Sequence, residues 1–155
     1  LSRRPFTMPD TTSTPSPHNT SPALPWLRVT AVSGFLFVAL GAFGAHALRE
    51  VLSTAAVETW RTASLYHAIH TLALGLVVLF LRNTPTRALR VAAWSFLSGV
   101  LLFSGSLYLL AVAGIRILGA ITPLGGVAFL AGWVALFLAA PGVFPSFTAS
   151  SRDFS

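Results

Sequence analysis

Seven side chains that can form hydrogen bonds or titrate stand within or at the ends of long apolar runs in this sequence. They are His46, Tyr66, His70, Ser104, Ser106, Tyr108 and Thr122. Imidazole, phenol and hydroxyl groups can tie helices together, line a ligand pocket or a proton-sensitive gate, or hold a metal ion. The choice among these chemistries depends on whether the chain brings the seven side chains together.

The elements that must position them are membrane-spanning helices. Apolar residues make up 54% of the 155-residue chain and charged residues 9%, whereas a soluble domain carries about 25% charged residues. The apolar residues form runs of about 20, the length of a helix that crosses a bilayer. The sequence therefore predicts an all-α, integral membrane four-helix bundle over 26–140, with spans at about 26–46, 63–81, 91–113 and 118–140.

The segments outside these spans are short and polar. Residues 1–25 are rich in Pro, Ser and Thr and predict a disordered tail, and 141–155 predict a second short tail. Residues 47–62 predict a short interfacial helix, capped by Thr54 and carrying an ion pair between Glu58 and Arg61. The first apolar run exceeds the 7–15 residues, roughly, of a signal-peptide core, so we favour a retained helix.

The net charge of +6 rests on arginine, because the chain has no lysine. One predicted side of the membrane holds Arg3, Arg4, Arg28, Arg82, Arg87, Arg90 and Arg152. The other side holds Arg49, Arg61 and Arg116, with two carboxylates nearby. The positive-inside rule then places both termini in the cytoplasm. Arginines at the ends of apolar runs indicate contact with anionic lipid headgroups, so we expect membrane lipid as a partner and no nucleic acid.

The seven polar side chains converge on one end of the predicted bundle. Span one ends at His46, span two begins with Tyr66 and His70, and span four begins with Thr122. By the predicted topology this end lies in the outer leaflet. Unsatisfied polar groups in hydrocarbon cost several kcal/mol each, so we expect these side chains to face the bundle interior.

Small residues and one proline indicate close approach between helices or a local break. These residues are Gly41, Gly44, Gly105, Pro123, Gly125, Gly126 and Gly132. Small side chains let helices pack closely in lipid, where no hydrophobic effect drives their association. Because a proline removes one helical hydrogen bond, Thr122–Gly126 is interpreted as a locally broken start of span four that lines the polar end.

Three interpretations of the polar cluster remain open. In the first, it ties the helices together by hydrogen bonds. In the second, it forms a pocket or gate in which His70 titrates. In the third and weakest, His46, His67 and His70 bind Zn²⁺. Catalysis has little support, because the predicted spans hold no Asp or Glu and the chain has no cysteine. We therefore expect no enzyme activity, no cofactor and no firm metal site.

Four segments together resemble a known family. They are LGAFGAHAL (40–48), TASLYHAIHTLAL (62–74), LFSGSLYLL (102–110) and ITPLGGVAFLAGW (121–133). They are similar to the family called domain of unknown function 423, with eukaryotic relatives called transmembrane protein 256. The resemblance implies a bacterial inner-membrane protein with four helices and brings no activity with it. It also implies that glutamine can replace His67, which leaves His46 and His70 as the better pair.

Two functional hypotheses follow from these features. The favoured one is a structural or accessory component of the membrane, alone, as a homo-oligomer or with a partner in a larger complex. The alternative is a small transporter or ligand-binding protein that uses the polar cluster. One copy has little room for a transport path, so transport would require an oligomer.

Overall fold

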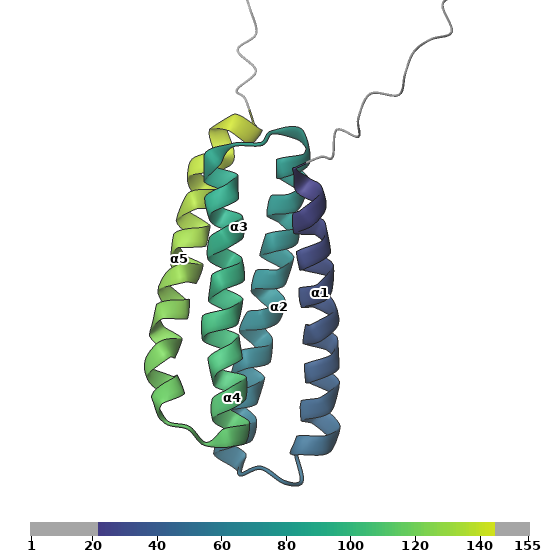
Figure 1. Cartoon of the computed structure of the whole chain (residues 1–155), viewed down its shortest axis with the longest axis vertical. Coiled ribbons are helices and arrows are strands. Elements are labelled where there is room, and N and C mark those ends of the chain that lie inside the picture. Colours follow the sequence, from purple (N-terminus) through teal and green to yellow (C-terminus); the bar gives the residue numbers. More distant parts are fainter. Residues whose placement is uncertain (1–21, 145–155) are drawn as a thin grey trace, which may run out of the picture.

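A computed structural model describes residues 22–144, and within that range the chain is helical and has no strand. Four helical rods lie side by side, and the described chain starts and finishes at the same end of the bundle (Figure 1). The elements are α1 (Ala23–Phe43), η1 (Gly44–Leu48), α2 (Thr54–Asn83), α3 (Arg87–Gly99), η2 (Val100–Gly105), α4 (Ser106–Ala113) and α5 (Ile117–Val143).

These elements form four spans that are long and apolar enough to cross a membrane, as the sequence predicts. The spans are Ala23–Leu48, Thr54–Asn83, Arg87–Ala113 and Ile117–Val143. Each extends beyond its predicted range, and α5 continues past Pro141. The predicted disordered tail falls on residues outside the described range, apart from the first residues of α1. The side of the membrane on which the termini lie stays a prediction.

The predicted interfacial helix is wrong as a separate element. Residues from Thr54 onward are the first turns of α2, a single helix of 30 residues. The segment contains no Gly or Pro to interrupt it. The N-cap is Ser53 and not Thr54: the Ser53 hydroxyl accepts a hydrogen bond from the Ala56 N–H at 3.3 Å.

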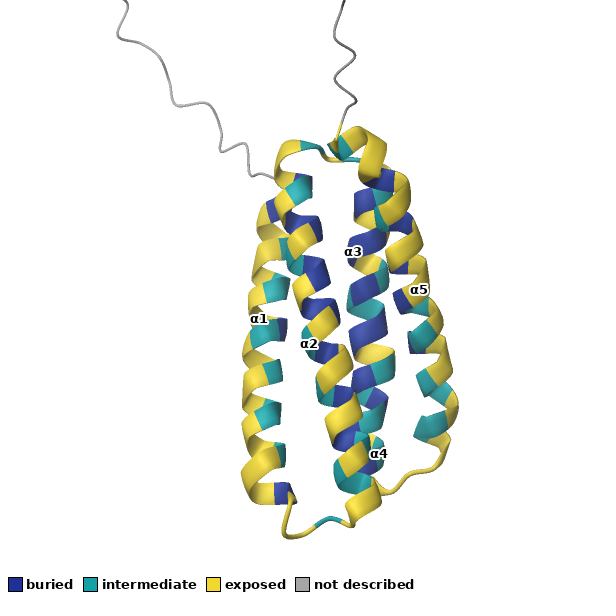
Figure 2. Ribbon diagram, turned by 180° about the vertical axis from the view of Figure 1, so that it is seen from behind, coloured by how far each residue is buried: buried dark blue, intermediate teal, exposed yellow. Residues whose placement is uncertain are grey.

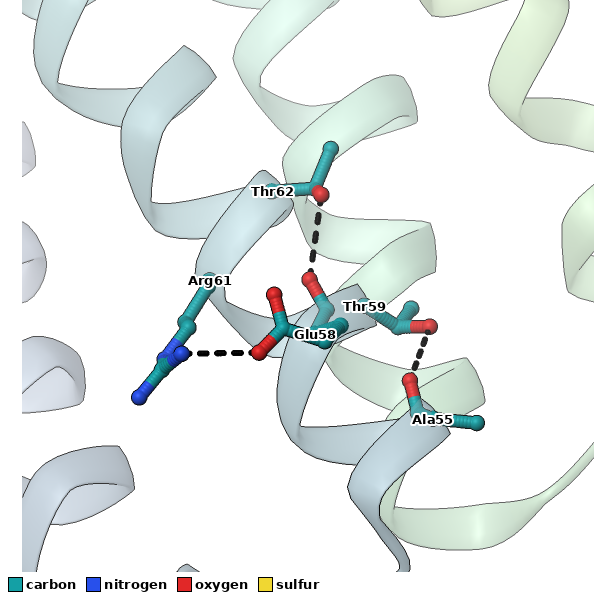
Figure 3. Close-up of polar contacts among 5 residues, drawn as sticks. All are labelled: Ala55, Glu58, Thr59, Arg61 and Thr62. Atoms are coloured by element: carbon teal, nitrogen blue, oxygen red, sulfur yellow. Dashed lines mark hydrogen bonds and ion pairs between the residues drawn. The ribbon is translucent and has the colours of Figure 1, made fainter.

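The predicted ion pair at the start of α2 is present. The Arg61 guanidinium lies 2.7 Å from a Glu58 carboxylate oxygen (Figure 3). In the same turns, two threonine hydroxyls donate to the carbonyls four residues earlier: Thr59 to Ala55, and Thr62 to Glu58. These contacts are exposed to solvent, so the ion pair contributes at most about 1 kcal/mol to the free energy of unfolding. It mainly marks the polar end of the span.

The four rods do not pack equally. α2 is the most buried span and α1 the least, and burial is concentrated on α2 and α3 (Figure 2). α3 packs along α5, whereas among the described residues α1 packs extensively on α2 alone. Phe96, Leu74 and Leu81 are fully buried at the centre. α1 is therefore a loosely attached fourth helix beside a three-helix core.

Four glycines allow the closest approaches in the bundle, and at one of them, Gly99, an added Cβ would overlap the Phe129 ring. A Cβ added at Gly132 would lie 2.6 Å from the Phe96 ring, one at Gly44 would overlap the Trp60 ring, and one at Gly125 would overlap the backbone of η2. The other glycines predicted to pack have more room. A Cβ at Gly41 meets nothing within 4 Å, and those at Gly105 and Gly126 make ordinary contacts at 3.9 Å.

Two π-helical segments interrupt the regular helices. η1 ends the first span and η2 lies within the third, between α3 and α4. The wider turn of a π-helix shifts the side chains that follow it, and such segments are frequent at functional sites. η2 places Val100, Leu101 and Gly105 on the side of the third span that faces α1.

Candidate functional site

A buried hydrogen-bonded network joins α1, α2 and α4. The Ser33 hydroxyl lies 3.1 Å from His67 Nε2 and 2.7 Å from the Thr71 hydroxyl. His67 Nδ1 lies 3.4 Å from the Tyr108 hydroxyl, which donates to the Ser64 hydroxyl at 3.1 Å. Ser33, His67, Thr71 and Tyr108 are all buried. This polar network attaches the weakly packed α1 to the rest of the bundle.

One assignment of protons satisfies every member of the polar network. Ser64 donates to the Trp60 carbonyl, so its oxygen accepts from Tyr108. The Tyr108 oxygen then accepts from His67 Nδ1–H, which leaves Nε2 to accept from Ser33, and Ser33 to accept from Thr71. A fully satisfied buried network stiffens the packing around it. The arrangement matches the first of the three interpretations, hydrogen bonds that tie helices together.

His70 lies in a separate aromatic pocket between α2 and α5. Its Nδ1 lies 2.9 Å from the Tyr66 carbonyl, and the Trp133 indole donates to Nε2 at 3.3 Å. The imidazole stacks on Phe129 at 3.4 Å between ring centroids, and the Tyr66 ring stacks beside it. Because a carbonyl only accepts and an indole only donates, His70 is the neutral tautomer with its proton on Nδ1.

A third polar contact joins the start of α5 to α4. The Ser106 and Thr122 hydroxyls lie 2.9 Å apart, and Ser106 also lies within 3.0 Å of the Phe103 carbonyl. The predicted break at Thr122–Gly126 is wrong, because α5 is continuous through Pro123. Pro123 lies in the second turn of α5, so the carbonyl that it leaves without a partner belongs to the first turn, near the polar end of the helix.

Ser104 is fully buried, and its hydroxyl has no hydrogen-bond partner among the residues that the structure describes. We expect Ser104→Ala to leave the free energy of unfolding unchanged or to raise it by up to about 1 kcal/mol, because the substitution removes an unsatisfied polar group. Ser106→Ala, which removes a satisfied hydroxyl, is the matched control and should lower it by about 1 kcal/mol. Detergent-titration unfolding measures both. Equal losses would mean that Ser104 has a partner.

His46 does not join the other histidines. It is exposed at the end of the first span, whereas His67 and His70 are buried among different partners. Within residues 22–144 no group of three or more His, Asp or Glu side chains could hold a metal ion. The geometry therefore gives no support to the three-histidine zinc hypothesis, and it makes His67, and not His46, the centre of the polar network.

The polar side chains also reach deeper than the sequence suggests. Ser33 lies near the middle of the first span and Thr71 near the middle of the second. The cluster therefore extends from one end of the bundle to its mid-depth and is not confined to one leaflet. Sequence reasoning missed Ser33, Ser64 and Thr71. The sequence feature that could have identified them is an isolated hydroxyl inside an apolar run, because such a hydroxyl needs a hydrogen-bond partner.

A groove about 440 Å³ in volume lies over this polar network. One wall is α1, through Val29, Val32, Leu36 and Leu40; the other is the third span, through Leu97, Val100, Leu101 and Gly105. Ser33, His67 and Tyr108 contribute to its floor, and Arg28 lies at one end. From Arg28 to Leu40 a helix rises about 18 Å. The groove is thus a long apolar channel, open to the side on which lipid lies.

A smaller pocket of about 240 Å³ lies at the opposite end of the bundle, where η1 meets the start of α2. Gly41, Trp60 and Arg49 line it. Of the polar network it touches only Ser64. Gly41 is one of the two described glycines at which an added Cβ has no neighbour within 4 Å.

Comparison with known proteins decides the family. The pattern of the family described as "Protein of unknown function (DUF423)" matches residues 40–126, more than half of the chain. The chain belongs to this family. The matched residues include His67, His70, Tyr108 and Thr122, and they begin after Ser33. The resemblance seen in the four sequence segments is therefore confirmed.

Two curated relatives carry names that describe them as membrane proteins. The chain is 46% identical over 112 residues to UPF0382 membrane protein YwdK of Bacillus subtilis (strain 168), covering 71% of this chain and 90% of the relative. It is 44% identical over 121 residues to UPF0382 inner membrane protein YgdD of Escherichia coli (strain K12), covering 74% and 87%. No solved structure matches the chain. The protein is therefore a small multi-pass protein of the bacterial inner membrane.

Proposed function

We propose that this protein is a non-catalytic, accessory membrane component that holds an apolar chain of a lipid-like molecule in the groove between α1 and the third span. The observation that carries the proposal is the groove itself. It is about 440 Å³ in volume, is lined almost wholly by apolar side chains, and has a rigid hydrogen-bonded floor. Concave, mostly apolar sites with a few fixed polar groups are the usual form of small-molecule sites.

Two features support a binding groove over simple helix packing. α1 is attached to α2 and leaves its other side open toward α3 and α4. Gly105 in η2 lines the groove, and a Cβ added there meets only the Val100 carbonyl, at 3.9 Å. The π-helical segment thus presents a gap where a larger side chain would fit, and this gap keeps the groove open.

The chemistry of the polar side chains supports a role without catalysis. The partners of His67 are hydroxyls, and those of His70 are a carbonyl and an indole. The two carboxylates among the described residues, Glu50 and Glu58, are exposed at one end of the bundle. A histidine that acts as a base in a triad is oriented by a buried acid. Neither histidine has one among the described residues.

Filling the groove tests the proposal. We expect Gly105→Phe to lower the affinity for a phospholipid about tenfold or more, because the ring takes the space of the chain and ~1.4 kcal/mol of lost contact is a tenfold change in Kd. Native mass spectrometry of the full-length protein in mild detergent, titrated with a phospholipid, measures the bound fraction.

The matched control is Gly41→Phe, at the glycine of the opposite pocket where an added Cβ also has open space. It should leave lipid binding as in the wild type. Equal lipid binding by Gly105→Phe and the wild type, with both folded by circular dichroism, would exclude this groove as the site. Assembly into a homo-oligomer or a larger complex stays a prediction.

A further inference from the structure

The described residues carry an unequal charge between the two ends of the bundle. Arg28, Arg82, Arg87 and Arg90 lie at the end where α1 and α3 begin and α2 finishes. None of these four arginines forms an ion pair within residues 22–144. The ion pair in that range joins Glu58 and Arg61, at the opposite end of the bundle. Their guanidinium groups therefore remain available to an anion from the membrane.

One of these arginines lines the groove, and a second lies on the helical stripe that continues into its other wall. Arg28, in the second turn of α1, lines the groove directly. Arg90, in the first turn of α3, lines a shallow hollow of about 470 Å³ together with Trp94 and Ser98. Helical spacing places Arg90 and Trp94 on the same stripe as Leu97 and Leu101, which line the groove.

An aromatic contact joins α1 to α3 at this level. The Trp26 and Trp94 rings, from α1 and α3, meet edge to face with centroids 5.0 Å apart. Tryptophan favours the depth of the lipid headgroups. The contact therefore marks where the headgroup region meets the hydrocarbon. Arg90 precedes Trp94 on its outer side, Arg28 follows Trp26 by about 3 Å of helical rise, and the apolar groove continues inward.

We propose that the occupant of the groove is an anionic phospholipid, with its phosphate between Arg28 and Arg90 and one acyl chain along Val32, Leu36 and Leu101. This inference rests on the proposed function and adds the chemical class of the ligand. A chain leaving the bilayer gains no hydrophobic energy by entering a groove, because lipid is as apolar as leucine. Charge at the headgroup therefore has to provide the selectivity.

The charge pattern favours this occupant over a second copy of the chain. A second copy would bring its own unpaired arginines to the same membrane surface, where like charges repel. An anionic headgroup instead neutralises them, and basic pockets between membrane helices are known sites for such lipids. A zwitterionic headgroup would bring a cation close to the same guanidinium groups and should bind more weakly.

Headgroup selectivity tests the inference. Full-length protein in mild detergent is titrated with phosphatidylglycerol and with phosphatidylcholine of identical chains, and bound lipid is counted by native mass spectrometry. We expect the wild type to prefer phosphatidylglycerol. Arg28→Gln and Arg90→Gln should each reduce that preference about fivefold, which is ~1 kcal/mol per arginine near an anionic surface. Arg116→Gln, exposed at the opposite end, should leave it unchanged.

The outcomes separate this inference from the proposed function. Equal binding of the two lipids by the wild type, combined with loss of both in Gly105→Phe, would overturn the anionic ligand and leave the groove intact. A preference that survives Arg28→Gln and Arg90→Gln would place the headgroup elsewhere and would also overturn the inference. A protein that runs as a dimer and retains no lipid would mean that a second copy covers the groove.

Discussion

Gly125→Ala is expected to destabilise the bundle, even though alanine is the better helix former. An added Cβ at this position would overlap backbone atoms of Leu102 and Phe103 in η2. A backbone obstacle cannot rotate away as a side chain can, so α5 must move off the third span. We expect the free energy of unfolding to fall by about 1–3 kcal/mol or more, as for overpacked cores. Unfolding in a titration with denaturing detergent measures it.

The neighbouring glycine provides the control. At Gly126 an added Cβ lies 3.9 Å from the Phe103 ring, an ordinary contact. Gly126→Ala should therefore be neutral or stabilising by up to about 1 kcal/mol, the usual gain when alanine replaces glycine inside a helix. If the two alanine variants lose the same stability, the close approach of α5 to η2 is wrong.

His67→Ala is expected to have the largest effect among the polar residues. The substitution removes Nε2, which accepts from the Ser33 hydroxyl, and the Nδ1–H group that donates to the Tyr108 hydroxyl. Loss of a buried partner costs about 1–3 kcal/mol, and the cavity adds to it, so we expect a total loss of about 2–5 kcal/mol. Because the polar network attaches α1, protease should also cut near α1 more readily in this variant.

Two comparisons isolate the hydrogen bonds of His67. His46→Ala removes the same atoms at an exposed position and should cost less than about 0.5 kcal/mol. His67→Gln keeps one donor and one acceptor and should recover most of the loss. A double-mutant cycle with Ser33→Ala should give a coupling of about 0.6–1.7 kcal/mol. A coupling near zero would contradict the contact between α1 and α2.

Much of the fold could be predicted from the sequence, because hydrophobic length alone identifies membrane spans. The four runs and the ion pair of Glu58 with Arg61 appear where expected. The prediction of a separate interfacial helix was wrong because helix propensity continues from Thr54 into the second span. No residue marks a boundary between the predicted interfacial segment and that span. The break at Pro123 was wrong because proline is tolerated near the start of a helix.

The site could be predicted only in part. The sequence placed His70, Ser106 and Thr122 inside the bundle, but their partners depend on the rotation of each helix, which an all-apolar run does not reveal. His46 looked equivalent to the other histidines, yet it lies exposed at the end of the first span. The groove depends on α1 lying apart from the third span and on η2, and neither leaves a signal in one sequence.

Covalent mapping of the bound chain tests the central claim most directly. Full-length protein in vesicles is illuminated with a phosphatidylglycerol that carries a photoreactive group in its acyl chain, and the adducts are located by mass spectrometry. The groove predicts adducts concentrated on residues 29–40 and 97–108. The adduct yield should fall strongly in Gly105→Phe and should stay at the wild-type level in Gly41→Phe. An equal yield on the exposed residues of α5, such as Leu124, Leu130 and Leu138, would show that the protein merely sits in lipid and would contradict a binding groove.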